Sequence, residues 1–543
     1  MKKKKSNFIV QGGILAMAGI LSRLIGIARR FPMQHIFGDK GNGYYAAAYS
    51  VYSLMLIISC YSLPLAVSKA VSSKISKRQY KSAQRVFQCA MIFALTMGGV
   101  TFFICEYLGD FLAEHIMEEP MGAMALKVLG PALLTVSVMG VFRGYFQGLG
   151  TMMPTAVSQI LEQVFVLIGS IAGTYVLYNY GGKVGALHHN EDYAPAYGAA
   201  GASIGPVLGS VVGLLFLAFV YVMYRKGSRR RSARENGRVD GYPQIFKLII
   251  LTIIPVLLSS TVYNISDVID TSIFGKVMVA KGMSDVKTDI WGVYTGKYKV
   301  LVNVPIALAN AMCSSIVPVL TKLMVREEYG RARERIGQAM RFTMIVAFPS
   351  SVGLAVLARP IISLLFKGEV DMAVNMLHVG SMSVVFFAIS TLTNGVLQGI
   401  NRMRVPVRNA AIALVIHVVF LYAALQMDMG INAVIYANIL FAAIVCILNA
   451  MAIRKYMRYN QELVRTFAIP AIASIVMGIV IGLLNMLLSK SAGKALTVFV
   501  GIGVGAIVYF AVLILLKGIN EHDLRSMPGG RTVLSIARRF RLM

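Results

Sequence analysis

Long apolar runs follow one another along the whole chain, and short segments between them carry most of the charged residues. Runs of roughly 20 apolar residues are long enough for a helix to cross a hydrocarbon core about 30 Å thick. We therefore predict an all-α integral membrane protein with about fourteen transmembrane helices. The predicted segments are 8–28, 44–68, 86–108, 123–145, 152–179, 197–224, 246–275, 292–321, 342–365, 372–399, 407–427, 430–452, 467–488 and 494–516.

Composition agrees with this interpretation. Of the 543 residues, 57% are hydrophobic and only 14% are charged, whereas a soluble chain has about 25% charged residues. The net charge of +29 comes from short Lys and Arg clusters between apolar runs rather than from a basic domain, so we expect no nucleic-acid partner. The five cysteines are scattered singly, which indicates neither a disulfide framework nor a metal site.

The distribution of charge predicts the orientation of the helices. Basic residues gather at 2–5, 74–85, 225–238 and 454–465, each after an even number of predicted crossings, whereas the loop at 106–122 contains acids and no Lys or Arg. Lys and Arg favour the cytoplasmic side. Both termini should therefore be cytoplasmic, and the apolar stretch after the N-terminal lysines is interpreted as a retained first helix rather than a signal peptide.

An internal repeat is visible when the two halves are compared. Leu63-Pro64 matches Val304-Pro305, and Gln147-Gly148 matches Gln398-Gly399, at offsets of roughly 237 to 252 residues. Both halves start inside, so this is a parallel repeat of two pseudo-symmetric six-helix lobes, which favours transport through a cavity between them. The predicted divisions are an N-lobe at 1–224, a basic cytoplasmic linker at 225–243, a C-lobe at 244–456, two further helices with a lipid-tail groove at 457–517, and a basic cytoplasmic tail at 518–543.

The first helix contains cations at unusual depth. Arg23 follows Ser22 roughly 20 Å along the helix, where a cation costs several kcal/mol unless it faces protein, water or an anion. Arg30 lies seven residues later on the same face. We predict that Arg23 lies in a substrate cavity, and that its planar guanidinium suits a phosphate. For Arg29 and Arg30 the alternative is that they extend to the outer interface.

Helix eight opens with further basic residues. Lys297 and Lys299 precede Asn303, and a flexible Lys here would join the arginines around a diphosphate. The alternative is two interfacial lysines at a helix end.

Two other sets of polar residues lie within apolar runs. Helix seven holds Asn264, Asp267 and Asp270, and its carboxylates share a face, so they either pair with cations or form a Na⁺ or H⁺ coupling site. On helix five, Gln159 and Glu162 contact either the substrate or a neighbouring helix.

Two stretches, 141–148 and 154–163, resemble the polysaccharide-transporter branch of the MOP exporter superfamily, and in particular its lipid II flippases of MurJ type in Gram-positive bacteria. The resemblance spans nearly the whole chain. It implies a MOP/MATE-like fold, a cationic central cavity and a groove beside the last two helices. Ser22, Arg23 and Arg29 match positions that the family uses for the diphosphate and headgroup, whereas Arg30 replaces an acidic residue of the Gram-negative pattern.

The resemblance implies a flippase of the bacterial plasma membrane rather than an enzyme. Its expected cargo is lipid II or a similar undecaprenyl-diphosphate-linked glycan, moved from the inner to the outer leaflet by a monomer among membrane lipids. No cofactor is expected, and Na⁺, H⁺ or the membrane potential would supply the drive. Two alternatives stay open: a flippase for another lipid-linked polysaccharide, such as a teichoic-acid or capsule precursor, and a MATE-like drug or cation antiporter.

Overall fold

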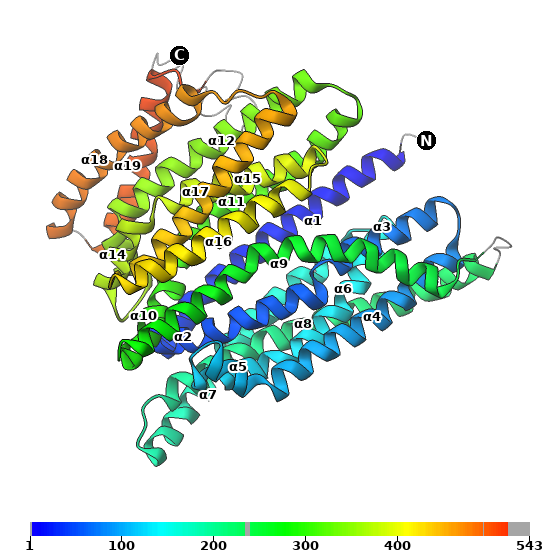
Figure 1. The fold of residues 1–543 in the computed structure, drawn as a ribbon, viewed down its shortest axis with the longest axis horizontal. Helices are drawn as coiled ribbons and strands as arrows, with labels where there is room; N and C mark the ends of the chain where they lie inside the picture. The colour runs from blue at the N-terminus through cyan, green and yellow to red at the C-terminus, as the bar shows by residue number, and fades with distance from the viewer. Residues whose placement is uncertain (1–2, 234–238, 492, 520–543) are drawn as a thin grey trace. The chain divides into compact units, whose positions relative to one another are not determined.

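The computed structural model describes residues 3–233, 239–491 and 493–519, and the regular elements in these ranges are all helices (Figure 1). The centre of the basic linker at 234–238 and the basic tail from 520 onward lie outside the described residues. By its internal contacts the chain divides into two compact units, Met1–Gly292 and Val293–Met543. The two units are described separately below.

The first unit consists of ten helices among its described residues, the last of which ends at the boundary. They are α1 (Lys3–Ala28), α2 (Arg30–Leu56), α3 (Leu63–Ser76), α4 (Tyr80–Tyr107), α5 (Gly109–His115), α6 (Ala123–Gly148), α7 (Met153–His188), α8 (Tyr193–Ala233), α9 (Tyr242–Ala280) and α10 (Ser284–Val293).

The second unit begins with a π-helical turn, η3 (Tyr294–Tyr298), and has a second such turn, η4 (Val464–Ala468). Its α-helices are α11 (Lys299–Val325), α12 (Tyr329–Val356), α13 (Ala358–Leu365), α14 (Val370–Gly380), α15 (Ser383–Gly399), α16 (Arg404–Gln426), α17 (Ile431–Met457), α18 (Ile469–Ser491) and α19 (Lys494–Leu515).

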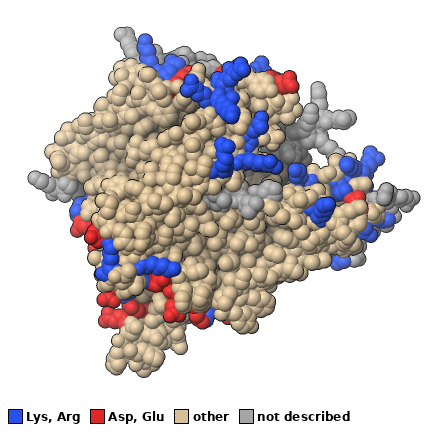
Figure 2. Space-filling view, in the orientation of Figure 1, with Lys and Arg blue, Asp and Glu red and all other residues tan. Residues whose placement is uncertain are grey.

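The length and apolar composition of these helices confirm a multi-pass membrane protein. In the part of the chain that the structure describes, 11 helical stretches are long and apolar enough to span a membrane, or 12 if the bent pair α14 and α15 is one span. The predicted total of about fourteen stays a prediction. Each of the predicted segments lies mostly on helical residues. Figure 2 shows wide surfaces without charge along the helices, with Lys and Arg gathered near helix ends.

A helical stretch can include two predicted crossings when the break between them is only one residue long. α2 is interrupted at Gly38, whose φ of 71° and ψ of −166° lie outside the helical region and favour glycine. The residues before Gly38 continue the direction set by α1, because Arg29 keeps helical angles between the two helices. Gly38 therefore lies between the first predicted crossing, 8–28, and the second, 44–68.

Two π-helical turns lie at equivalent places in the two halves of the sequence. The turn η1 spans Ile57–Tyr61 and comes just before Pro64, and η3 spans Tyr294–Tyr298 and comes before Pro305. The two turns lie 237 residues apart, within the offsets of the predicted repeat. A π turn inserts one residue into the helical ladder and is often found at functional sites. The shared position supports the repeat, while the arrangement of the lobes stays a prediction.

The unit boundary differs from the predicted linker boundary. α9 and α10 pack in the first unit, whereas the sequence placed this segment in the C-lobe at 244–456. The physical reason lies in the contact between α2 and α10. Asn42 Nδ2 donates to the Gly292 carbonyl at 2.9 Å, and Gly43 and Gly292 lie so close to the opposite backbone that a Cβ atom would collide with it. The predicted lobe boundaries themselves stay a prediction.

Candidate functional site

Arg29 is a buried cation whose contacts are all neutral. It lies between α1 and α2 with 9% of its surface exposed. Its Nη1 donates to Ser170 Oγ on α7 at 3.1 Å, and its Nη2 donates to the Tyr45 hydroxyl on α2 at 3.5 Å. Its Nε is buried without a hydrogen-bond partner among the described residues. The site therefore holds a full positive charge and one unused donor.

Two arginines near Arg29 in the sequence, Arg23 and Arg30, also have no acidic partner among the described residues. Arg23 is exposed on α1 and Arg30 is half-buried directly after Arg29. Within residues 3–233, 239–491 and 493–519, none of the three forms an ion pair. A cation at membrane depth is costly unless it is paired or hydrated. Three neighbouring cations without a carboxylate therefore form a region suited to an anion from outside the chain.

Tyrosines line the same part of α2. The rings of Tyr45 and Tyr49 stack with centroids 5.7 Å apart, and Tyr49 and Tyr52 lie 5.5 Å apart. Tyr45 and Tyr52 are buried. The stack holds the hydroxyl of Tyr45 at Arg29 and adds no negative charge, so the positive charge of the region remains.

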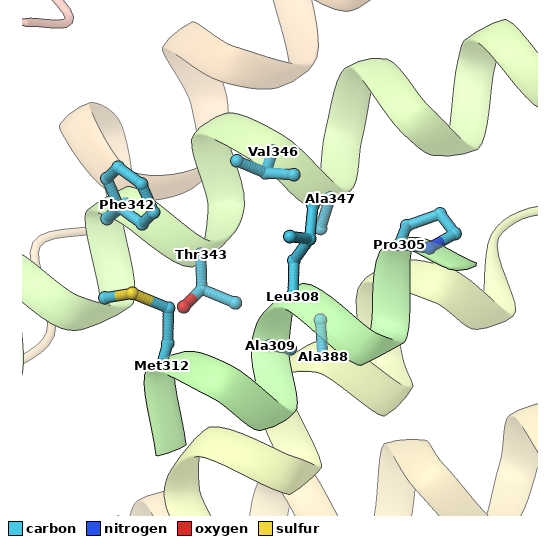
Figure 3. A pocket seen from close by; sticks show the side chains of 9 residues that line it. All are labelled: Pro305, Leu308, Ala309, Met312, Phe342, Thr343, Val346, Ala347 and Ala388. Carbon is cyan, nitrogen blue, oxygen red and sulfur yellow. The ribbon is translucent and has the colours of Figure 1, made fainter. Parts of the chain in front are cut away.

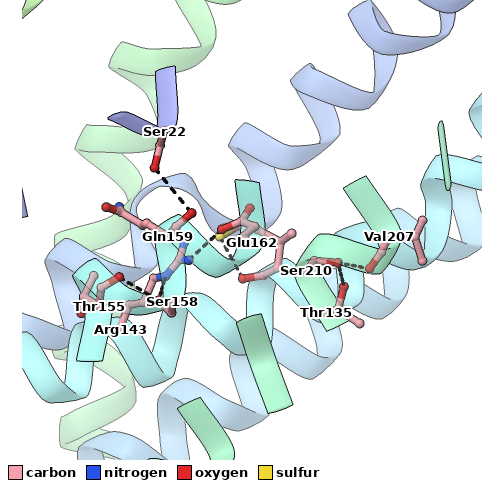
Figure 4. A network of polar contacts seen from close by, with 11 residues as sticks. Ser22, Thr135, Arg143, Thr155, Ser158, Gln159, Glu162, Val207 and Ser210 are labelled. Carbon is pink, nitrogen blue, oxygen red and sulfur yellow. Dashed lines mark hydrogen bonds and ion pairs between the residues drawn. The ribbon is translucent and has the colours of Figure 1, made fainter. Parts of the chain in front are cut away.

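Glu162 pairs with a cation of the neighbouring helix, and its contact with the substrate stays a prediction. Its Oε2 lies 2.7 Å from Arg143 Nη2, and Arg143 Nε donates to Ser158 Oγ at 3.1 Å (Figure 4). The two charged side chains are 13% and 19% exposed. The pair joins α6 to α7, which agrees with the helix-to-helix alternative. From the sequence alone, Arg143 was not identified as the partner of Glu162. An acidic and a basic residue in consecutive apolar runs are a signal that could have predicted the pair.

Ser22 and Gln159 lie together where α1 packs on α7. Ser22 Oγ donates to the Gln159 carbonyl at 3.4 Å (Figure 4). The side-chain Oε1 of Gln159 and the hydroxyl of Thr155 are both buried without a hydrogen-bond partner among the described residues. One acceptor and one hydroxyl close to Ser22 are therefore left unused by the described residues. Whether Gln159 contacts the substrate stays a prediction.

The predicted residues of the second unit are held in different ways. Lys297, in η3, is fully buried, and its Nζ donates to the Glu369 carbonyl at 2.9 Å. Lys299 lies 5.6 Å from the centre of the Tyr294 ring, and Asn303 is exposed on α11. Lys297 thus ties η3 to the connection between α13 and α14. Substrate binding by these three residues stays a prediction.

The acidic residues of α9 also have separate surroundings. Asp270 is 1% exposed, Asp267 is half-buried and Asn264 is exposed. The Thr271 hydroxyl donates to the Asp267 backbone carbonyl at 2.7 Å rather than to its carboxylate. In the part of the chain that the structure describes, no group of three or more His, Cys, Asp or Glu could hold a metal ion. The choice between a coupling cation and an ion pair stays open.

An apolar pocket lies between α11, α12 and α15 in the second unit (Figure 3). Its side chains are Pro305, Leu308, Ala309, Met312, Phe342, Thr343, Val346, Ala347 and Ala388. This lining contains no charge, so it suits hydrocarbon and not a diphosphate.

Comparison with known families decides the class of protein. The family model described as "Polysaccharide biosynthesis protein" matches residues 10–324, which is more than half of the chain. The chain belongs to this family. A second model, MatE, matches residues 295–423.

Curated members with similar sequences cover almost the full length. The chain is 26% identical to the lipid II flippase MurJ of Bacillus subtilis (strain 168), over 95% of this chain and 96% of that protein. It is 23% identical to stage V sporulation protein B of the same organism, over 96% of this chain and 98% of that protein. The MurJ relative is a flippase, and the similar solved structures are a flippase and a transporter, so the predicted transporter class, rather than an enzyme, is confirmed.

Solved structures of the superfamily share the fold. Lipid II flippase MurJ in an inward closed conformation aligns with a TM-score of 0.64 at 16% identity, over 92% of this chain and 97% of that one. An inward-facing MATE multidrug transporter of the MOP superfamily gives a TM-score of 0.64 at 16% identity, over 83% of this chain and 98% of that one. The predicted MOP/MATE-like fold is thereby confirmed.

Proposed function

We propose that this family member is a flippase that moves a polyprenyl-diphosphate-linked cell-wall precursor, with lipid II as the favoured cargo, from the inner to the outer leaflet. The observation that carries the proposal is Arg29, a buried cation with neutral partners and an unused Nε donor. A diphosphate provides the missing negative charge and accepts from the planar guanidinium fork. Arg23 on α1 and Arg30 at the start of α2 add positive charge.

The proposed mechanism is alternating access without covalent chemistry. The arginines hold the diphosphate, Ser22 and Gln159 contact the headgroup, and an apolar groove beside α18 and α19 shelters the lipid tail. Both termini are cytoplasmic in this proposal, because the basic segments lie on that side. An inside-negative potential favours outward movement of an anion by about 2.3 kcal/mol per charge per 100 mV. A cation at Asp267 and Asp270 is the alternative drive.

A different lipid-linked glycan is the second candidate cargo. The chain is similar over nearly its full length both to the lipid II flippase MurJ and to stage V sporulation protein B, whose name states no cargo. Every polyprenyl diphosphate presents the same anion to Arg29, so the arginine site does not separate these cargoes. A MATE-like antiporter for drugs or cations would need carboxylates in its cavity, and the uncompensated arginines count against that reading.

The test is depletion of the protein in its own host, followed by labelling of lipid II in each leaflet. We expect lipid II to accumulate in the inner leaflet, and wild-type protein but not the Arg23→Ala variant to restore its export. Normal export in the depleted strain would require a second depletion of any parallel flippase. Normal export after that step would rule out lipid II as the cargo.

A further inference from the structure

The connection between α17 and α18 contains a cluster of buried polar atoms. Three atoms here have incomplete hydrogen bonding in the part of the chain that the structure describes: the Tyr459 hydroxyl, Gln461 Nε2 and Thr466 Oγ1. Thr466 is 1% exposed. A buried donor left without a partner costs about 1–3 kcal/mol. Three of them within eight residues therefore indicate that something else fills the site.

All three groups can donate a hydrogen bond. Burial, and to a smaller extent the nearby charge of Glu462, raises the pKa of Tyr459 to about 12, so its hydroxyl stays protonated at physiological pH. A side-chain hydrogen bond with Gln461 partly offsets this shift, and the Gln461 amide nitrogen carries a second N–H that this bond does not use. Gln461 Nε2 only donates, whereas the two hydroxyls donate and accept. An acceptor such as a phosphate oxygen can bond to all three.

A cation from a neighbouring helix adds positive charge to this cluster. Arg341 of α12 is 16% exposed, and its Nη1 lies 3.9 Å from Glu462 Oε2. The Glu462 side chain is 57% exposed, so solvent screens this contact. The buried side of the cluster thus combines a guanidinium with three neutral donors.

The cluster lies at the depth of lipid headgroups. The apolar span of α17 ends at Met457, and the next span begins at Val464. Arg454, Lys455 and Arg458 are exposed at the same end. Basic residues at a helix end favour the cytoplasmic leaflet, where phosphates are abundant acceptors without a donor of their own.

We propose that Arg341, Tyr459, Gln461 and Thr466 bind a phosphate group, from either an inner-leaflet phospholipid headgroup or free phosphate. This phosphate site is in the second unit and does not depend on the arginines of α1. Its occupant satisfies the buried donors and fixes the connection that leads into α18 and α19. The test of this phosphate site is therefore independent of the identity of the cargo.

The experiment uses the purified full-length protein in detergent. Native mass spectrometry measures retained phosphatidylglycerol against phosphatidylcholine, and thermal unfolding measures the response to inorganic phosphate. The donor variant combines Gln461→Leu with Thr466→Val, and Tyr459→Phe is a milder second variant that removes one hydroxyl. The control, Arg454→Gln with Lys455→Gln, removes two exposed charges from the same connection.

We expect the donor variant to lose phosphatidylglycerol retention roughly tenfold, Tyr459→Phe to lose less, and the control to match the wild type. If inorganic phosphate instead stabilises the wild type and not the donor variant, without lipid selectivity, the ligand is free phosphate. Equal binding by the wild type and both donor variants would overturn the proposal and leave only ordered water at the cluster. Loss in the control alone would also overturn it, because diffuse surface charge would then explain the binding.

Discussion

Arg29 and Arg143 are both largely buried guanidinium groups of the first unit, but their partners differ. Arg143 faces Glu162 at 2.7 Å and Ser158 at 3.1 Å, so its charge is balanced within the protein. Among the described residues, the Arg29 guanidinium donates hydrogen bonds only to the hydroxyls of Ser170 and Tyr45. The comparison teaches that depth in the membrane alone does not identify a functional arginine. What distinguishes the two is the partner. Arg143 pairs with a carboxylate, whereas Arg29 has no carboxylate partner among the described residues and is therefore the candidate diphosphate ligand.

A buried lysine of the first unit, Lys287, resembles Arg143 in having an acidic partner within the protein. Lys287 Nζ lies 3.1 Å from Glu119 Oε1, and the Thr288 hydroxyl donates to the same carboxylate at 2.7 Å. These side chains join α10 to the connection before α6, and both Lys287 and Glu119 are more than nine-tenths buried. Here too a buried cation has its anion inside the protein, so we assign the pair to structure.

The largest effect is expected from breaking the balanced pair. Glu162→Gln leaves Arg143 with a buried charge and should lower the free energy of unfolding by about 3–5 kcal/mol. Replacing both residues, with Arg143→Met and Glu162→Leu, should recover most of that loss because no charge remains buried. Unfolding in detergent micelles measures both. A single variant as stable as the wild type would show that the pair does not stabilise the unit.

Arg29→Met should have the opposite profile. Export should be lost, while the free energy of unfolding stays unchanged or rises, because the variant removes a buried charge whose partners are neutral. Complementation of a depleted strain and unfolding of the purified variant give the two readings. If Arg29→Met unfolded as readily as Glu162→Gln, Arg29 would be a structural residue like Arg143.

Glu119 allows a pH test of the second balanced pair. Burial raises the pKa of Glu119, while Lys287 and Thr288 partly offset the shift. The folded state thus holds this proton more tightly than the unfolded state, and stability falls as pH rises from the ordinary carboxyl pKa through the raised one. Glu119→Gln should flatten this decline. The measurement is the melting temperature at several pH values across that range, with the exposed Glu114→Gln as the control. If the melting temperatures of the two variants changed equally with pH, the assignment would be contradicted.

The smallest effect is expected from a partner of Arg29. Ser170→Ala removes one hydrogen bond to Nη1, worth about 0.5–1.5 kcal/mol, and should weaken cargo binding a few-fold through a less fixed guanidinium. Thr174→Ala on the same helix is the control, since its hydroxyl donates to the Ser170 backbone carbonyl. Equal cargo affinity in both variants would mean that Ser170 does not position Arg29.

Sequence patterns predicted the helices well because each apolar run must form its own backbone hydrogen bonds in a membrane. They could not predict which polar residues pair across helices. Lys297 is an example, since its partner is a backbone carbonyl 72 residues away. Arg143 and Glu162 also came from separate runs whose packing the sequence does not reveal. The depth of Arg23 could be predicted from its position along the first apolar run. The neutral partners of Arg29 could not be predicted, because they come from α2 and α7 and meet Arg29 only in the folded protein.

Direct binding of lipid II to the purified protein tests the central claim most directly. The wild type, Arg29→Gln and the exposed control Arg331→Gln would be compared at one salt concentration. Arg331 is 74% exposed and pairs with Glu328 at the surface. We predict that Arg29→Gln weakens binding roughly 10- to 100-fold, as expected for loss of charged hydrogen bonds, and that Arg331→Gln binds like the wild type. Equal affinity of all three proteins would contradict the assignment of Arg29 as the diphosphate ligand.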